Sequence, residues 1–167
     1  MKIDDWLVNG GVGLVSLRFV ESLCTDPAFN LSLEQYLFYD LALKDNYFFL
    51  WQNDNAVIIG KNQNTTEEIN ENYVRERHVK VIRRLTGGGA VYHDMGNLNF
   101  SFIVNQKNCQ DIDFYTFTSI IVKALQQLKI QAETNGRNDI LVAEKKISGN
   151  AQCIKNNRIL HHGTLMF

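Results

Sequence analysis

The chain has 167 residues, of which 45% are hydrophobic and 21% are charged, a balance that predicts one globular domain with a substantial core. The formal net charge is −1 at pH 7, so the overall charge gives no reason to expect binding to nucleic acid. No apolar run approaches the length needed to cross a membrane, so we expect no membrane partner.

The cysteines predict neither a disulfide framework nor a zinc site. Cys24, Cys109 and Cys153 are odd in number and far apart, and no Cys-x-x-Cys pair occurs. Residues 1–5 begin no apolar signal segment, so we expect the chain in a reducing cytoplasm.

The first part of the chain predicts a leader, a strand and a helix. Residues 1–13 are rich in glycine and are expected to form a flexible leader, whereas residues 14–167 are expected to form one domain. Alternating apolar and polar residues predict a strand at 14–20. Asn30 is expected to cap a helix with an apolar stripe that ends near Asp45.

Two strands and a second helical segment are predicted next. Residues 47–51 and 56–59 have strand composition, and the Asn-Asp-Asn segment at 53–55 predicts a hairpin between them. A polar loop follows at 60–64. The sequence from Thr66 has the form of a weak capping box and predicts a helix to about residue 77.

The remaining elements complete a mixed order. Strands are predicted at 80–84 and 97–104, a helix at 114–128, and short strands with polar turns from there to the end. The strand at 97–104 has one polar face, with Asn97, Asn99 and Ser101, and one apolar face, with Leu98, Phe100, Phe102 and Val104. The helix has an apolar side made of Phe117, Ile120, Ile121, Ala124, Leu125 and Leu128. This order predicts an α/β fold of the α+β type, with a mixed, largely antiparallel sheet flanked by helices.

Two arginines and three consecutive glycines form the most distinctive stretch of the chain. Arg83 and Arg84 lead into Gly-Gly-Gly at 87–89. Backbone without Cβ atoms can lie directly against a ligand, its N–H groups can converge on an anion, and the guanidinium groups add positive charge. A glycine hairpin with a solvated polar face is the plainer interpretation, but it explains the arginines and the following His93-Asp94 poorly.

This stretch resembles the lipoate–protein ligase family. The family pattern Arg-Arg-x-Ser/Thr-Gly-Gly-Gly-Ala-Val-x-His-Asp-x-Gly-Asn is matched throughout at 83–97. A second block agrees, with Gly-Arg-Asn-Asp-Ile at 136–140 and Lys-Lys-Ile-Ser-Gly-Asn-Ala at 145–151, and a third is His-His-Gly-Thr at 161–164. The resemblance runs from about residue 26 to 167 and implies the biotin/lipoate synthetase-like fold, which is related to class II aminoacyl-tRNA synthetases.

The resemblance also implies the residues of a site. The family's ligand-holding lysine maps to Lys146, whose ammonium is able to bridge a carboxylate and an α-phosphate, and we expect it to be catalytic. The expected ATP contacts are Lys146, Arg84, Gly89, Ala90, Val91 and Tyr92, with Gly87 and Gly88 shaping the turn. The expected lipoate contacts are Lys146, Arg84, Gly88 and His93.

The other polar residues of these blocks have less definite roles. Asn138 and Asp139 are candidates for the Mg²⁺–nucleotide side, because amide and carboxylate oxygens suit a hard cation, although Asp139 fits the start of a strand equally well. For His93-Asp94 a structural or substrate-lining role is favoured. Adjacent residues such as His161 and His162 point to opposite faces of a strand, so they predict no two-histidine metal site.

The implied function is a ligase that uses ATP and Mg²⁺ to activate lipoate, or octanoate, and transfers the acyl group to a lysine of a carrier domain. The implied carriers are lipoyl domains of 2-oxoacid dehydrogenases and the glycine cleavage H protein. A cysteine-dependent octanoyl or lipoyl transferase is one alternative, for which Cys153 is the candidate thiol; one transferase branch has its cysteine just before the His-Gly, where this chain has His161. A non-catalytic lipoyl- or nucleotide-binding module is another. The apolar segment at 159–167 has no closing turn, so we expect a catalytic domain that is incomplete at its C-terminus.

Overall fold

The computed structural model describes residues 17–41, 45–105, 114–136 and 138–167. The predicted leader, the start of the first predicted strand, Cys109 and Arg137 lie outside these ranges. No helix in the described part of the chain is long and apolar enough to span a membrane.

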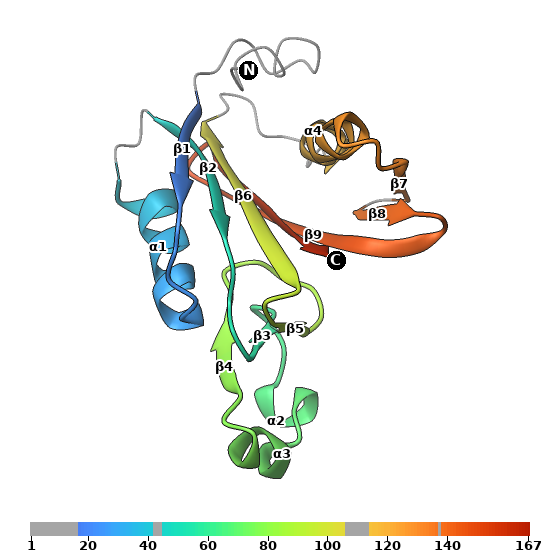
Figure 1. Cartoon of the computed structure of the whole chain (residues 1–167). Coiled ribbons are helices and arrows are strands. Elements are labelled where there is room, and N and C mark those ends of the chain that lie inside the picture. The colour runs from blue at the N-terminus through green and yellow to red at the C-terminus, as the bar shows by residue number, and fades with distance from the viewer. Residues whose placement is uncertain (1–16, 42–44, 106–113, 137) are drawn as a thin grey trace.

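Seven strands form the main sheet, in the order β1-β2-β6-β10-β9-β8-β7 (Figure 1). Their bounds are β1 Leu17–Glu21, β2 Asn46–Trp51, β6 Asn97–Asn105, β7 Ala132–Asn135, β8 Asp139–Val142, β9 Lys145–Lys155 and β10 Arg158–Met166. Only β1 and β2 run parallel within this sheet, and its other neighbours are antiparallel. The predicted mixed, largely antiparallel sheet is therefore confirmed. The last two strands are longer than expected, with 11 residues in β9 and 9 in β10.

A second sheet has three strands, in the order β4-β3-β5. They are β3 Ala56–Ile59, β4 Lys80–Arg83 and β5 Val91–His93, with β3 parallel to β4 and antiparallel to β5. The predicted hairpin between β2 and β3 is wrong, because the two strands belong to different sheets. The segment between them is not a solvated turn: Asn53 is buried, accepts a hydrogen bond from Asn30 Nδ2 at 3.1 Å and lies 3.1 Å from His93 Nδ1.

Helix α1 spans Pro27–Tyr39, so it begins earlier than predicted and also ends earlier, at Tyr39 and not near Asp45. Its N-cap is Asp26, whose side chain accepts from Phe29 N at 3.0 Å, and Pro27 fits the first turn because that position needs no N–H donor. The predicted cap Asn30 is wrong, since this residue lies inside the helix. Its buried Nδ2 donates to the Cys24 and Gln52 carbonyl oxygens, each at 2.8 Å, and so ties the helix to the end of β2.

The single helix predicted over 66–77 is two short helices, α2 Thr65–Glu68 and α3 Glu71–Glu76. Asn70 separates them because its side chain accepts from Tyr73 N at 3.1 Å and caps a new helix. Helix α4 spans Phe114–Gln127, as predicted to within one residue. Leu128, which was expected on its apolar side, is 72% exposed just beyond the helix end.

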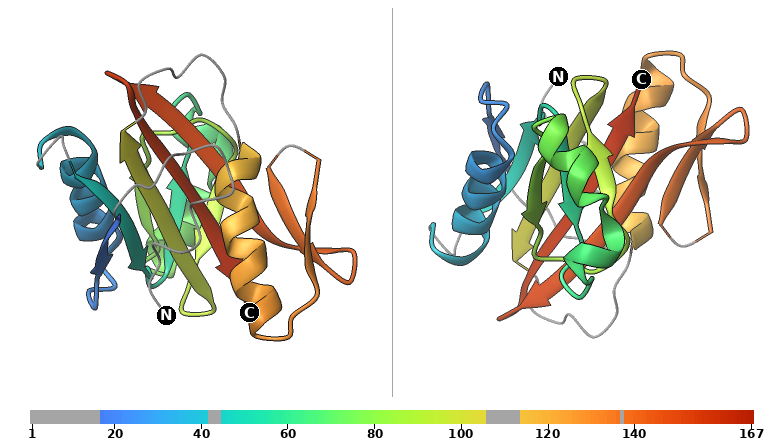
Figure 2. Two further views of the ribbon diagram at one scale, coloured as in Figure 1. Left: turned by 90° about the horizontal axis from the view of Figure 1, so that it is seen from above. Right: turned by 90° about the horizontal axis from the view of Figure 1, so that it is seen from below.

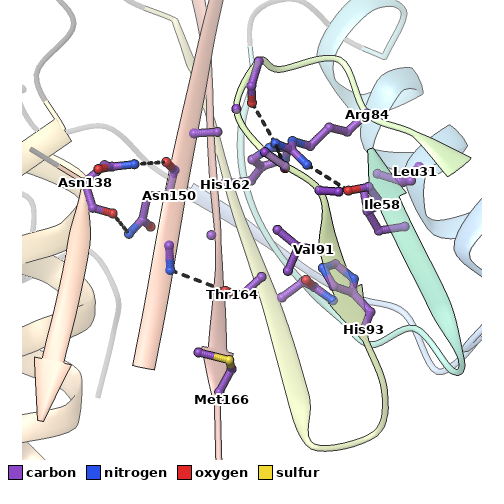
Figure 3. Close-up of a pocket in the computed structure, with 18 of the residues that line it drawn as sticks. Leu31, Ile58, Arg84, Val91, His93, Asn138, Asn150, His162, Thr164 and Met166 are labelled. Atoms are coloured by element: carbon purple, nitrogen blue, oxygen red, sulfur yellow. Dashed lines mark hydrogen bonds between the residues drawn. The ribbon is translucent and has the colours of Figure 1, made fainter. Parts of the chain in front are cut away.

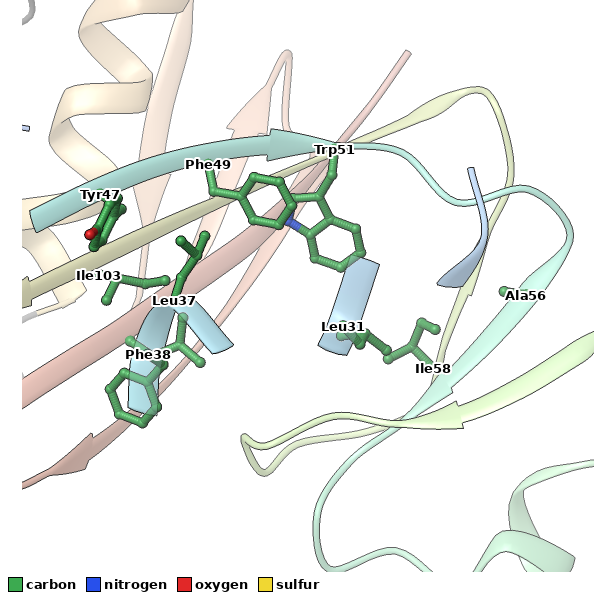
Figure 4. Packing of buried hydrophobic residues seen from close by; sticks show 10 residues of the cluster. Leu31, Leu37, Phe38, Tyr47, Phe49, Trp51, Ala56, Ile58 and Ile103 are labelled. Atoms are coloured by element: carbon green, nitrogen blue, oxygen red, sulfur yellow. The ribbon is translucent and has the colours of Figure 1, made fainter. Parts of the chain in front are cut away.

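Helices α1 and α4 lie on opposite sides of the main sheet (Figure 2), and each face of the sheet carries its own apolar core. On one face α1 and β3 pack against the sheet, in a cluster made of Leu31, Leu37, Phe38, Tyr47, Phe49, Trp51, Ala56, Ile58, Ile103 and Leu160 (Figure 4). On the other face α4 packs against Phe100, Phe102, Val104, Ala132, Ile140 and Ile159 through Phe117 and Ile121. Alternate residues of β2 and β10 belong to opposite clusters, as a twofold strand repeat requires. We call these the α1 face and the α4 face.

Candidate active site

A cavity of about 300 Å³ opens between the loop after β4 and the strands β9 and β10 (Figure 3). Its apolar side chains are Leu31, Trp51, Ile58, Val91 and Met166. Its polar and charged side chains are Arg84, His93, Asn99, Asn138, Lys146, Asn150, His162 and Thr164. Gly87, Gly88, Gly89, Ala90, Gly149, Ala151 and Gly163 complete the lining. We call residues 84–91 the glycine wall and residues 138–151 the lysine wall.

Arg84 builds the glycine wall from within. Its guanidinium donates to the carbonyl oxygens of Gly87 and Gly89, each at 2.8 Å, and to that of Ile58 at 3.1 Å. Its Nε donates to Thr86 Oγ1 at 3.1 Å, so four of its five N–H donors are already used. Burial lowers the pKa of Arg84, although a guanidinium stays charged in proteins. Arg84 therefore fixes the curvature of the loop around a half-buried positive charge.

The three glycines of the glycine wall differ in backbone conformation and in the space around them. Gly88 has a φ of +100°, a conformation that residues with a side chain rarely adopt. A Cβ atom built on Gly87 or on Gly89 would meet nothing within 4 Å. Gly88 thus shapes the turn, and open space lies beside its two neighbours.

The loop after β3 supports the glycine wall from outside, which sequence reasoning missed. A Cβ atom on Gly60 would lie 2.1 Å from Gly88 O, and Lys61 N donates to Thr86 O at 2.8 Å. Arg83, which was expected to add charge beside the glycines, instead donates to the Gly60 carbonyl oxygen at 2.8 Å and to Thr65 Oγ1 at 2.9 Å. The polar composition of residues 60–64 had predicted only a loop.

A chain of buried hydrogen bonds connects α1 to the glycine wall. Ser101 Oγ donates to Glu34 Oε1 at 2.5 Å, and His162 Nδ1 donates to the same carboxylate oxygen at 2.9 Å. The other ring nitrogen, Nε2, lies 2.7 Å from Thr86 Oγ1, which also accepts from Arg84. Glu34 is fully buried. The one signal for its role in the sequence was a carboxylate among the apolar residues of the helix.

His93 enters the cavity from β5 as a neutral ring. Asn53 Nδ2 donates to its Nδ1 at 3.1 Å, so its proton is on Nε2. The Asn53 amide orientation is fixed because its oxygen accepts from Asn30. Burial, with smaller contributions from His162 and Arg84, lowers the pKa of His93 to about 4.

A β-bulge directs Lys146 into the cavity. Strand β8 pairs Ile140 with Ser148 and Leu141 with Lys146, so Ile147 is an extra residue between them. In a regular ladder Lys146 would share the α4 face with buried Ile140; the bulge turns it to the opposite face, where Asp139 also lies. There Lys146 Nζ pairs with Asp139 Oδ1 at 2.8 Å, and the lysine side chain remains 52% exposed.

Two asparagines near the two ends of the lysine wall, Asn138 and Asn150, are hydrogen-bonded to each other. Asn138 Nδ2 donates to Asn150 O at 3.0 Å, and Asn150 donates back to Asn138 O from both its backbone N, at 3.0 Å, and its Nδ2, at 2.8 Å (Figure 3). Of the two residues proposed for a magnesium–nucleotide side, Asn138 lines the cavity and Asp139 lies behind it, paired with Lys146.

Tyr92 and Cys153, like Asp139, lie outside the cavity lining. The Tyr92 side chain is exposed and donates from its hydroxyl to Asn55 Oδ1 at 3.1 Å. Cys153 is half-buried against the α1-face cluster, and burial raises the pKa of its thiol to about 11. The structure brings together Arg84, Gly87, Gly88, Gly89, Ala90, Val91, His93, Asn138 and Lys146, all of them expected from the sequence. Adjacent His161 and His162 do point to opposite faces of β10, as predicted.

A family model described as the lipoyl protein ligase A/B catalytic domain matches residues 26–167. The chain belongs to this family. The predicted resemblance to lipoate–protein ligases is thereby confirmed.

The sequence identity to one lipoate–protein ligase shows how similar the chain is to members of this family. The chain is 50% identical over 142 residues to lipoate–protein ligase 1 of Staphylococcus aureus, covering 85% of this chain and 43% of the relative. The chain therefore spans less than half the length of that ligase.

Solved structures of ligases share the fold. The structure of Plasmodium falciparum LipL1 in complex with lipoate superposes with a TM-score of 0.78 at 38% identity, over 90% of this chain and 48% of that chain. A lipoate-protein ligase A bound with ATP gives a TM-score of 0.78 at 28% identity, over 91% of this chain and 65% of that chain. The lipoate synthetase-like fold expected for the family is confirmed by these likenesses.

Proposed function

We propose that this chain carries the adenylating site of a lipoate–protein ligase. The observation that carries the proposal is the position of Lys146, which the bulge in β9 turns into the cavity opposite the glycine wall. A mobile ammonium facing a glycine-rich loop suits a reaction between two anions. The lipoate-bound and ATP-bound ligases of the same fold support this choice of substrates.

The proposed first step joins lipoate to the nucleotide. A carboxylate oxygen of lipoate forms a bond to the α-phosphorus of ATP, the bond from that phosphorus to the bridging oxygen breaks, and pyrophosphate leaves. The products are lipoyl-AMP and pyrophosphate. Lys146 bears three N–H donors and one positive charge, and these would offset the repulsion between the carboxylate and the phosphate.

Each wall contributes a different part of the ligand site. The open space beside Gly87 and Gly89 would admit phosphate oxygens against backbone N–H groups. The apolar side chains of Leu31 and Trp51 would receive the acyl chain of lipoate or octanoate. His93, neutral at pH 7, would offer its Nε2–H as a hydrogen-bond donor within the cavity.

Asn138 and Asp139 fit a magnesium ion that is held mainly by the nucleotide. Mg²⁺ commonly takes one or two carboxylates and completes its octahedron with phosphate oxygens and water. Asn138 would supply one amide oxygen from the cavity lining, and the neighbouring Asp139, which is paired with Lys146, would supply one carboxylate. Such an ion would neutralise phosphate charge during adenylation.

The proposed second step transfers the lipoyl group to a carrier. The amine of a lysine on a lipoyl domain, or on the glycine cleavage H protein, attacks the lipoyl carbonyl; an amide forms and AMP leaves. No thiol takes part. The position of Cys153 outside the cavity and the raised pKa of its thiol give the transferase alternative no support.

Lipoate-dependent exchange of labelled pyrophosphate into ATP tests the proposal directly. Exchange should require both lipoate and Mg²⁺, because only reversible adenylation returns label to ATP. Binding of lipoate and ATP without any exchange would favour the binding-module alternative. Acyl transfer from a loaded carrier without nucleotide would favour the transferase.

A further inference from the structure

His161 is a buried histidine that the proposed reaction does not use. It is fully buried on the α4 face of β10. Its ring stacks on Phe117 with centroids 4.8 Å apart and meets the edge of Phe114 at 5.6 Å, and Phe100 and Phe102 lie at 6.3 Å each. An aromatic cage of this kind suits an apolar side chain, so a polar ring within it requires an explanation.

The carbonyl oxygen of Asn138 determines which nitrogen of the His161 ring carries the proton, through the side chain of Asn150. Asn138 O only accepts, so the Asn150 side chain must direct its Nδ2 toward it, at 2.8 Å. The Asn150 Oδ1 then faces His161 Nε2 at 3.3 Å, and that nitrogen must carry the proton. The remaining nitrogen, Nδ1, is bare and accepts from Gln152 Nε2 at 2.7 Å. Burial lowers the pKa of His161 well below its ordinary value, which keeps the ring in this neutral form.

The partner of His161 belongs to the lysine wall. Asn150 and Asn138 exchange three hydrogen bonds, which we call the asparagine clasp. The clasp holds the start of β8 against β9, immediately before Asp139 and its ion pair with Lys146. Residue 163 is glycine, and a Cβ atom there would lie 2.2 Å from Asn150 Oδ1 and 2.5 Å from Phe100 Cζ, so the missing side chain leaves room for this amide and for the ring of Phe100.

We propose that His161 is a positioning residue, which holds the asparagine clasp by donating from Nε2 to Asn150 and thereby keeps the lysine wall in place for the nucleotide. The last part of this inference rests on the proposed function, whereas the clasp itself does not. His161 acts from behind the sheet: it touches the α4 core on one side and an amide of the cavity lining on the other.

Two substitutions separate positioning from packing. His161→Gln keeps an N–H donor near the place of Nε2 but loses the ring, whereas His161→Phe keeps the ring packing but loses the donor. If His161 positions the clasp, His161→Phe should bind a non-hydrolysable ATP analogue roughly tenfold more weakly, and His161→Gln should bind within about twofold of wild type. The opposite ranking, or equal losses in both, would mean that the ring only fills space and would overturn the proposal.

Nuclear magnetic resonance of the ligand-free chain tests the clasp without a substrate. The wild-type ring should be the Nε2–H tautomer with a bare Nδ1, and the Asn150 side-chain amide protons should exchange slowly. Those protons should exchange at least tenfold faster in His161→Phe and in Gly163→Ala, which displaces Asn150 while leaving the histidine intact. An Nδ1–H tautomer in the wild type would overturn the proposal even if both variants fail to fold. A wild type that keeps the clasp but binds no nucleotide would overturn the proposed function instead.

Discussion

Among the described residues that line the cavity, Arg84 and Lys146 are the two with arginine or lysine side chains, and their surroundings differ. Arg84 is half-buried and gives three donors to its own loop and one to the carbonyl oxygen of Ile58 in β3. Lys146 is half-exposed and has one partner, the carboxylate of Asp139. An anion that enters the cavity could replace Asp139 as the partner of Lys146 at little cost, because exposed ion pairs are weak. Arg84 has one N–H donor left and could offer more only by giving up its bonds to the glycine wall. The family resemblance leads us to expect both in ligand binding. Their contacts indicate different parts: Arg84 shapes the glycine wall, and Lys146 is left accessible to a ligand.

The largest expected effect is on Lys146. Lys146→Ala should lower lipoate-dependent pyrophosphate exchange by on the order of a thousandfold, because a charge facing the reacting groups is lost. The melting temperature should hardly change, since exposed ion pairs contribute little to stability. Lys145→Ala is the matched control, because Lys145 pairs with Val142 and points to the other face. Similar losses in the two variants would contradict the assignment.

A substitution at Arg84 should affect stability strongly, whereas the substitution at Lys146 should affect activity and hardly change stability. Arg84→Lys keeps the charge but cannot reproduce the forked hydrogen bonds, so we expect a loss of roughly 2–4 kcal/mol in the free energy of unfolding. Chemical denaturation measures this, with Arg75→Lys on exposed helix α3 as the control. A stable Arg84→Lys variant that has lost only nucleotide affinity would show that Arg84 acts on the ligand directly.

Alanine substitutions at Gly60 and at Gly87 test whether the loop after β3 supports the glycine wall. The first would press on the wall from outside, and the second would only enter the open space beside it. Gly60→Ala would place a Cβ atom 2.1 Å from Gly88 O and should destabilise the fold by about 1–3 kcal/mol. Gly87→Ala meets no atom within 4 Å and should leave the melting temperature unchanged. Calorimetric melting of the two variants makes the comparison. Equal melting temperatures would mean that the loop after β3 gives no support.

The lowered pKa of His93 predicts that the free energy of unfolding falls as the pH drops from about 6.5 to about 4. The pKa of His93 is lowered to about 4 in the folded protein, whereas an unfolded histidine titrates near 6.5. Between these values the unfolded chain binds a proton that the folded chain does not, so acid favours unfolding, by up to about 1.4 kcal/mol per pH unit. Above pH 6.5 neither state is protonated and this contribution is constant. Denaturation at several pH values should give a shallower slope for His93→Gln, and an unchanged slope would argue against a buried neutral ring.

The smallest effect is expected for Cys153→Ser. The thiol lies outside the cavity, and the proposed transfer forms no thioester. Lipoylation of an acceptor domain, followed by mass spectrometry, should therefore remain nearly at the wild-type level. Loss of transfer in this variant would restore the cysteine-dependent alternative.

Local patterns in the sequence predicted the parts of the molecule that depend on neighbouring residues. The alternation at 97–104 and the helical repeat at 114–128 gave β6 and α4 nearly correctly. The consecutive glycines pointed to one wall of the cavity, whereas the Lys-Lys-Ile-Ser-Gly block pointed to the other only through its resemblance to the ligase family. These signals suffice because steric freedom at glycine and strand periodicity are properties of short segments.

Contacts between distant residues could not be predicted in the same way. Glu34 and His162 are 128 positions apart, and only the packing of α1 on β10 brings them together. The bulge at Ile147 comes from unequal pairing of β8 and β9, which a single strand does not reveal. Asn30 and Asn53 have the composition of caps and turns, yet both are buried because their amides satisfy backbone groups and each other.

His161 and His162 support opposite walls of the cavity from adjacent positions on β10. A single peptide unit joins them, so the spacing between the two supports is set by covalent geometry and by a strand that is paired on both sides. Because both histidines are held on one strand that is paired on both sides, the two walls have little freedom to move apart or together. In the proposed ligase, the side chains inside the cavity would then discriminate between acyl chains of different length, and opening or closing of the cavity would contribute little.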